Sequence, residues 1–344
     1  MDDARTPPYR FPTTTVIVDD NADFLTNFSL ELQEKQAYRL FDLPREALRF
    51  LERSEAAMPP LFQRCFSPHR EAVGWPMRDH YLRLDISSLE GEIRNPDRFG
   101  EVSVVIVDYA MPEMNGLEFC EQLQNEQVKK VLFTGVGDEK VAVQAFNDGL
   151  IDRFLRKHEP NVAQTLNRTI AELETRYFQE VGNLIHQSLR KGEAEFLDDA
   201  AFAAYFSDLC RRRSVSEYYF VAEPNGFLML DAEATPSRLV VMTEEDMQAH
   251  WEIASDQGCP RALSEAISRR SAVPYFWRSG GYYRPHCVDW EDFLFPADVI
   301  EGRQRYYVAY LDGPDAYRGL RDSVVSYREY LKRLDAGPAL LPAN

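Results

Sequence analysis

Short apolar runs separated by amphipathic stretches mark the first half of the chain. The clearest run is Val104–Val107, four consecutive β-branched residues, which is typical of a strand buried on both faces of a parallel sheet. Further runs predict strands over residues 14–18, 38–43, 131–134 and 151–157. Apolar residues at helical spacing predict helices over residues 22–36, 44–54 and 117–123. This alternation of strands and helices predicts an α/β fold around a parallel sheet.

Polar residues with complementary chemistry end four of these strands: Asp19-Asp20, Asp108, Thr134 and Lys157. Because the carboxyl ends of parallel strands meet at one edge of a sheet, we expect these side chains to lie close together. Aspartates packed together repel one another unless a cation intervenes, and Mg²⁺ takes oxygen ligands together with phosphate. The pattern therefore predicts a magnesium site at which the Asp108 carboxylate accepts a phosphoryl group, held by the hydroxyl and the ammonium. For Asp108 taken alone, capping of the following turn is the alternative.

Residues 14 to about 160 resemble the receiver domain of two-component response regulators. The resemblance rests on the motifs Asp19-Asp20, Asp108, Met111-Pro112, Gly116, Thr134-Gly135, Phe154 and Lys157. It implies a CheY-like, flavodoxin-like fold: a doubly wound, five-stranded parallel sheet with strand order 2-1-3-4-5. It also implies a partner histidine kinase or phosphotransfer protein that supplies the phosphoryl group.

The resemblance assigns a role to each residue around the phosphoacceptor. It makes Asp108 the phosphoacceptor and a ligand of Mg²⁺. Asp20 and Asp19 would also hold the metal, with Asp19 in support, and the backbone carbonyl of Ala110 would be a further ligand.

Three residues would respond to the phosphoryl group. Thr134 would hydrogen-bond it, Lys157 would pair with its oxygens, and the aromatic ring of Phe154 would move inward. The chain departs from the family at the next position, where His158 replaces the usual proline. Because a cis bond before a residue other than proline costs about 3 kcal/mol, we expect a trans Lys157–His158 bond.

The segment between Asp20 and the predicted phosphoacceptor, Asp108, is unusually long. Asp20 and Asp108 are 88 positions apart (108 − 20), whereas a helix, a strand and a second helix need about 40. An insertion over about residues 55–100 accounts for the excess, with a helix predicted over 86–93 that Asp85 or Ser87 caps. Topology predicts that it begins on the face opposite the phosphate site, as a docking surface or helix extension and not a catalytic lid. The alternative is a poorly ordered loop, but its aromatic content argues against that.

The second half of the chain predicts a separate α+β domain. A connector over 161–192 contains one long helix, 162–190, whose near-heptad stripe suggests a homodimer or packing against the second domain. Residues 193–338 then predict an antiparallel sheet with helices, in which Pro224-Asn225-Gly226 joins two strands as a hairpin. The order loosely suggests a PAS-like or profilin-like sensory module. The first domain would therefore span residues 12–160.

Composition narrows the function classes. The net charge is −17 and is shared evenly by the two halves, so nucleic acid is an unfavoured partner. No apolar stretch predicts a membrane span, and no signal peptide is evident. Five scattered cysteines predict free thiols in a reducing cytoplasm.

The output of the second domain has three candidate classes. The first is a switch that acts by protein interaction or ligand sensing, in which case the chain itself is not an enzyme. The second is a receiver-controlled enzyme with an active site that carries no recognisable motif. The third is a nucleic-acid-binding transcriptional regulator, which the acidic charge disfavours. His286-Cys287 is at most half a metal site, and the aromatic residues at 275–277, 282–283 and 290 serve core packing more readily than a ligand pocket.

Overall fold

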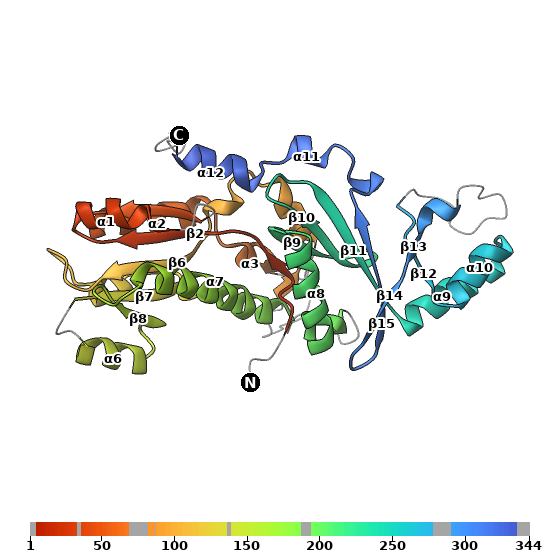
Figure 1. The fold of residues 1–344 in the computed structure, drawn as a ribbon, viewed down its shortest axis with the longest axis horizontal. Coiled ribbons are helices and arrows are strands. Elements are labelled where there is room, and N and C mark those ends of the chain that lie inside the picture. The colour runs from red at the N-terminus through yellow and green to blue at the C-terminus, as the bar shows by residue number, and fades with distance from the viewer. Residues whose placement is uncertain are drawn as a thin grey trace, which may run out of the picture. The chain divides into compact units, whose positions relative to one another are not determined.

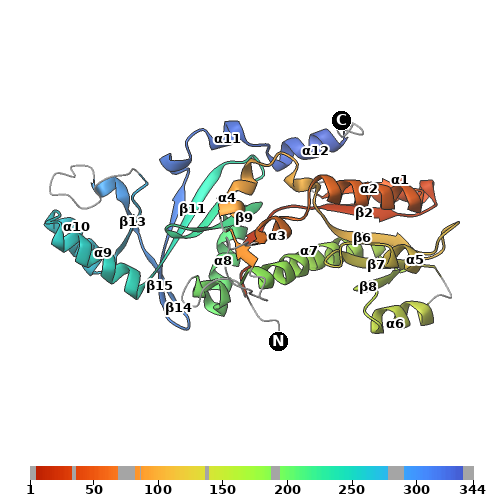
Figure 2. The same ribbon diagram turned by 180° about the vertical axis from the view of Figure 1, so that it is seen from behind.

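A computed structural model describes residues 5–32, 36–68, 82–85, 87–135, 139–186, 194–277 and 290–335 (Figures 1 and 2). The chain divides into two compact units, which we describe separately. The parallel-sheet unit comprises residues 11–64, 96–184 and 330–344, and the antiparallel-sheet unit comprises residues 1–10, 65–95 and 185–329. The chain therefore passes from one unit to the other five times, after residues 10, 64, 95, 184 and 329.

The parallel-sheet unit contains the predicted five-stranded sheet. Its strand order is β3-β2-β6-β7-β8, and every neighbouring pair runs parallel, which confirms the predicted order 2-1-3-4-5. The strands are β2 (Thr14–Val18), β3 (Ala37–Phe41), β6 (Val102–Asp108), β7 (Lys129–Thr134) and β8 (Arg153–Arg156). All seven residues of β6 are buried, as its β-branched run predicts.

Helices cover both faces of this sheet, so that two apolar cores form (Figure 1). The helices of the unit are α1 (Ala22–Ser29), α2 (Pro44–Ala57), α3 (Leu61–Arg64), α5 (Gly116–Glu121), α6 (Glu139–Asn147) and α7 (Val162–His186), which continues past residue 184. Side chains of α1 and α7 pack on one face, and those of α2, α5 and α6 pack on the other. Alternate residues of each strand supply the two cores, which is the arrangement of a doubly wound fold.

Helix α1 is shorter than predicted, and the predicted end of α7 is not described. α1 ends at Ser29 instead of residue 36, and residues 33–35 lie outside the described residues. In α7, the end of the predicted helix, 187–190, also lies outside them. The apolar stripe predicted for pairing is already buried within the chain at Leu173, Tyr177 and Val181, whereas Leu184 is 39% exposed. A homodimer through the connector helix stays a prediction, because most apolar residues of the described part of this helix are buried and few are exposed to a second copy.

The antiparallel-sheet unit is built around a six-stranded antiparallel sheet with the order β1-β9-β10-β11-β15-β14. Its strands are β1 (Tyr9–Arg10), β9 (Glu217–Ala222), β10 (Asn225–Leu230), β11 (Pro236–Thr243), β14 (Asp298–Glu301) and β15 (Arg305–Asp312). The predicted hairpin joins β9 to β10, and Asn225 pairs with Ala222 across it. The antiparallel sheet is confirmed, while its likeness to PAS or profilin modules stays a prediction.

Smaller elements complete this unit. They are β4 (Phe66–Pro68), β5 (Leu82–Leu84), β12 (Ala272–Pro274), β13 (Leu294–Pro296), α4 (Ser87–Gly91), α8 (Ala200–Arg212), α9 (Glu244–Asp256), α10 (Arg261–Ser268) and α11 (Leu320–Ser323). β12 pairs with β13 in a separate two-stranded sheet. Helix α12 (Tyr327–Asp335) follows α11, and the chain from Tyr330 onward belongs to the parallel-sheet unit. His286-Cys287 lies outside the described residues.

The insertion before β6 differs most from its prediction. Its residues 65–95 belong to the antiparallel-sheet unit, although the predicted boundaries assign them to the first domain. The predicted helix forms as α4, whose first backbone N–H, on Ser87, donates to Asp85 at 3.1 Å. Leu89 and Ile93 are fully buried. The reason for the difference is burial, because an insertion with such residues needs an apolar core to pack against.

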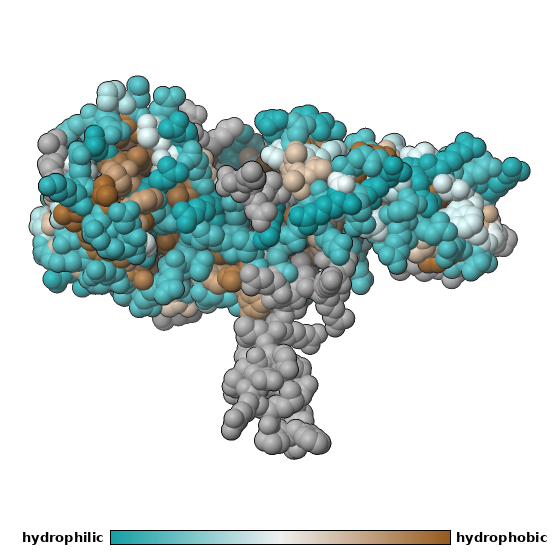
Figure 3. Space-filling model, turned by 90° about the horizontal axis from the view of Figure 1, so that it is seen from below, coloured by the Kyte–Doolittle hydropathy of each residue, from teal (hydrophilic) through white to brown (hydrophobic). Residues whose placement is uncertain are grey.

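Exposed apolar side chains gather on α6. Val141, Val143 and Phe146 are all exposed, and Figure 3 shows hydrophobic residues at this end of the parallel-sheet unit. In the part of the chain that the structure describes, no helix is both long and apolar enough to cross a bilayer.

Candidate phosphoryl and metal site

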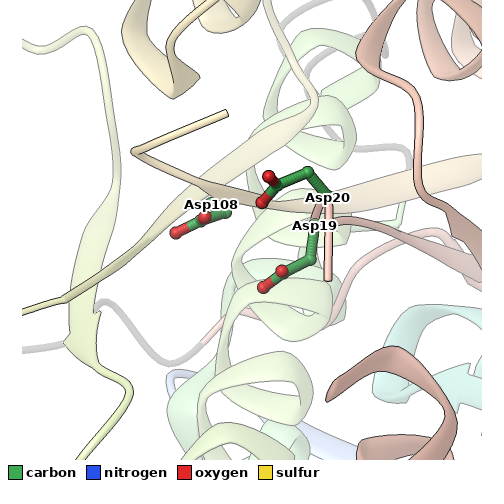
Figure 4. Close-up of side chains that lie close together, drawn as sticks. All are labelled: Asp19, Asp20 and Asp108. Carbon is green, nitrogen blue, oxygen red and sulfur yellow. The ribbon is translucent and has the colours of Figure 1, made fainter. Parts of the chain in front are cut away.

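Three carboxylates meet where β2 and β6 end, as Figure 4 shows. One oxygen from each of Asp19, Asp20 and Asp108 lies within 4.8 Å of the other two. Asp19 is 1% exposed and Asp108 5%, whereas Asp20 is exposed. The backbone N–H of Asn21 donates to Asp19 Oδ1 at 3.0 Å, which fixes the deeper carboxylate. The parallel register brings these residues together, because β2 and β6 are neighbours in the sheet.

Lys157 lies between the two buried carboxylates. Its Nζ is 2.7 Å from Asp19 Oδ2 and 2.9 Å from Asp108 Oδ1. Burial lowers the pKa of Lys157, but the hydrogen bonds and charges of the two aspartates outweigh this, so its pKa lies above the ordinary value. Burial raises the pKa of Asp19 above its ordinary value, because the hydrogen bonds from Lys157 and Asn21 offset only part of the loss of hydration. Lys157 is therefore positively charged at neutral pH. Its single charge does not balance the three carboxylates around it.

Thr134 contributes a hydroxyl without a protein partner. It ends β7, and its Oγ is buried and makes no hydrogen bond within the described residues. Buried hydroxyl groups in proteins are nearly always hydrogen-bonded, so this one suits a ligand oxygen. The carbonyl of Thr134 accepts the backbone N–H of Lys157 at 2.9 Å, which ties the two strand ends together.

The donor set fits a divalent cation such as Mg²⁺. All the available ligand atoms are oxygens, their negative charge exceeds the single charge of Lys157, and Asp20 is open to solvent. Ala110, whose carbonyl is predicted to join this set, is exposed in the loop after β6.

Phe154 lies on β8 opposite Leu132 and is partly buried against the core that α2, α5 and α6 cover. It therefore lies in the strand that leads to Lys157. The Lys157–His158 bond is trans as predicted, because the one cis peptide bond among the described residues is Glu223–Pro224.

Two aromatic residues at the site were not predicted as site residues from the sequence. The rings of Phe24 and Phe133 face Lys157 Nζ, with centroids at 5.1 Å and 5.9 Å. The sequence held one signal that Phe24 could lie at the site. Phe24 is in the first turn of the helix that directly follows Asp19-Asp20, and the first turn of such a helix lies near the strand end.

The loop from Asp108 to α5 needs glycine at its end. The backbone N–H of Gly116 donates to the carbonyl of Tyr109 at 3.0 Å, and a Cβ at Gly116 would lie 2.4 Å from the carbonyl oxygen of Asp108. Asn115 caps α5 by accepting from the backbone N–H groups of Leu117 and Glu118. Without a side chain at Gly116, the loop can pass close to the backbone of Asp108.

Replacing Gly116 by alanine is expected to lower the free energy of unfolding by about 2 kcal/mol, since a crowded methyl group costs about 1–3 kcal/mol. Urea denaturation measures the change. The matched control is Gly135→Ala, because a Cβ at Gly135 meets no atom of the described residues within 4 Å. Equal stability of the two variants would contradict this account of the loop.

Within the described residues, the antiparallel-sheet unit contains a cavity of about 280 Å³ whose lining is largely apolar. The turn between β9 and β10 and helix α9 line it, with polar groups from Glu223, Asn225, Asp246 and His250. Asp246 is occupied in capping α9, where it accepts from the Thr243 backbone N–H at 2.8 Å. The aromatic residues Tyr275, Phe276, Trp277 and Trp290 pack in the adjoining apolar core.

Comparison with known proteins agrees with the geometry. The family model of the response regulator receiver domain matches residues 92–167. The solved structure of the response regulator LqsR from Legionella pneumophila matches with a TM-score of 0.80 and 36% identity, over 97% of this chain and 98% of that one. The chain belongs to the response regulators. This response regulator is also 35% identical over 65 residues to the cyclic di-GMP phosphodiesterase response regulator RpfG of Xanthomonas campestris pv. campestris (strain 8004). That match spans 18% of this chain and 17% of RpfG.

Proposed function

We propose that this response regulator is switched by phosphorylation of Asp108. The observation that carries the proposal is the convergence of three carboxylates, the Lys157 ammonium and the buried, unpartnered hydroxyl of Thr134. A histidine kinase or phosphotransfer protein would donate the phosphoryl group. The Asp108 carboxylate oxygen attacks the phosphorus, and the bond from phosphorus to the donor nitrogen breaks.

Asp19, Asp20, Asp108 and the backbone carbonyl of Ala110 would hold Mg²⁺. When bound, the metal neutralises charge on the phosphoryl oxygens. Thr134 donates its hydroxyl hydrogen to one of these oxygens, and Lys157 pairs with another. Both groups already lie at the strand ends beside Asp108 before transfer, which favours stabilisation of the charge that develops.

The switch follows from the exchange of partners by Lys157. In the unmodified site its ammonium binds Asp19 and Asp108, and a phosphoryl group on Asp108 offers it more negative charge. Thr134 then acquires a hydrogen-bond acceptor, and Phe154 on β8 moves inward. Such local changes bias a two-state equilibrium of the surrounding elements.

We infer that the output acts by protein interaction or ligand sensing in the cytoplasm. The net charge of −17 disfavours nucleic acid. A receiver-controlled enzyme is the alternative, but the cavity of the antiparallel-sheet unit is largely apolar, and Asp246, one of its two carboxylates, is engaged in capping α9. A change of homodimerisation through α7 would rely on the exposed Leu184.

Acetyl phosphate tests the proposal directly. The full chain incubated with acetyl phosphate and Mg²⁺ is expected to gain one phosphoryl group by intact mass, and to lose it on treatment with hydroxylamine, which cleaves acyl phosphates. Incubation with EDTA is expected to prevent the modification. No incorporation, or the same incorporation with EDTA, would overturn the proposal.

A further inference from the structure

The Lys157 ammonium has two kinds of neighbour. Asp19 Oδ2 and Asp108 Oδ1 accept from it at 2.7 and 2.9 Å. The rings of Phe24 and Phe133 lie on the remaining side, with centroids 5.1 and 5.9 Å from Nζ, within the range of a cation–π contact. The side chain is only 17% exposed, so the rings replace water around the charge.

The two rings belong to a fixed aromatic group. Phe24 and Phe133 are 5.5 Å apart, and Phe28 stacks on Phe24 at 5.4 Å. Phe28 and Phe133 are buried, whereas Phe24 is partly exposed at the edge of the group. The Phe24 ring therefore has one face supported by the core and lies beside the charged site.

Asn21 links Phe24 to the carboxylate of Asp19 by hydrogen bonds. Asn21 accepts the backbone N–H of Phe24 at 2.9 Å, and the backbone N–H of Asn21 donates to Asp19 at 3.0 Å. The position of the ring is thus coupled to that of the buried carboxylate through two hydrogen bonds.

We propose that Phe24 is a positioning residue that holds the Lys157 ammonium between Asp19 and Asp108, and so sets how strongly this ammonium competes with Mg²⁺ for the two carboxylates. The inference rests on the proposed function, since it concerns the same metal site. A carboxylate that accepts from an ammonium is a poorer metal ligand, because part of its charge is already neutralised. Attraction to the ring stabilises the lysine in this competing position.

Titration calorimetry of the full chain with Mg²⁺ tests this. The variant Phe24→Leu keeps the apolar contact but removes the ring, and is expected to bind Mg²⁺ about fivefold more tightly, from the usual strength of a cation–π contact. Phe24→Tyr retains the ring and is expected to restore the affinity of the wild type. Phe28→Leu is the matched control, because it alters the same helix and aromatic group without a ring facing Lys157.

The outcomes separate the inference from the proposed function. If the wild type binds no Mg²⁺, the metal part of the proposed function fails, and the inference fails with it. If the wild type binds Mg²⁺ and Phe24→Leu binds it equally or more weakly, or if Phe28→Leu binds it as tightly as Phe24→Leu, the inference alone is overturned. Circular dichroism checks that each variant is folded. A ¹⁵N spectrum of the lysine ammonium gives a second measurement, in which the Lys157 signal is expected to shift in Phe24→Leu and not in Phe24→Tyr. An unshifted signal in Phe24→Leu counts against the proposal.

Discussion

Replacement of Asp108 by alanine is expected to abolish phosphorylation by acetyl phosphate, with at least a hundredfold loss of incorporation. Alanine has no oxygen that could attack phosphorus. Asp19 cannot substitute, because it lies deeper, accepts from both Lys157 and Asn21, and is 1% exposed. Intact mass after a fixed incubation with acetyl phosphate and Mg²⁺ measures the loss.

The control for Asp108→Ala is a structural aspartate in the same unit. Asp152 accepts the backbone N–H of Lys130 at 2.9 Å and pairs with Arg176 at 3.2 Å, at the start of β8 and not at its end. Asp152→Asn is expected to retain phosphorylation. Modification of Asp108→Ala to the level of the wild type would show that the acceptor is another residue.

Replacement of Gly226 by alanine is expected to destabilise the antiparallel-sheet unit by about 4 kcal/mol, the largest effect on stability that we predict. Gly226 has φ +142°, and an added Cβ would lie 2.0 Å from the carbonyl oxygen of Leu239 on the neighbouring strand. That carbonyl also accepts from the buried guanidinium of Arg238 at 2.6 Å, and Arg238 donates to the carbonyl of Pro224 as well. The methyl group therefore disturbs the backbone, the β10–β11 pairing and two hydrogen bonds of a buried cation.

Guanidinium chloride denaturation, followed by near-ultraviolet circular dichroism, measures this change. Gly91→Ala is the matched control in the same unit, because its Cβ would meet no atom within 4 Å and its φ is not positive. It is expected to be neutral or slightly stabilising. A Gly226→Ala protein as stable as the Gly91→Ala protein would mean that the β10–β11 pairing adjusts to the methyl group without cost.

The parallel sheet and the grouping of its polar residues were predictable from sequence for one physical reason. Strands buried on both faces are continuous apolar runs, so the residue that ends each run is evident, and a parallel sheet places these ends at one edge. Asp108 after Val104–Val107 is the clearest case. The cap of α4 by Asp85 was predictable because it depends on neighbouring residues alone.

Contacts between residues far apart in the sequence were not predictable in this way. β1 has only two residues, Tyr9 and Arg10, and no periodicity distinguishes it from a loop. The insertion carries apolar residues that need a core, but nothing in its pattern says which unit supplies it. Phe24 falls in the same class, since its apolar character predicts burial and does not reveal that a lysine 133 positions later would lie over its ring (157 − 24).

The five passages of the chain between its two units bear on how such a regulator can evolve. A regulator whose parts meet at one linker can acquire a new effector by a single gene fusion. Here a fusion after residue 160 would keep residues 65–95 but remove most of the unit to which they belong. It would also remove residues 330–344 from the parallel-sheet unit that it keeps. Recombination at one junction therefore yields two incomplete units. We expect this pair of units to be inherited together, by duplication and divergence of the whole gene and not by exchange of effectors.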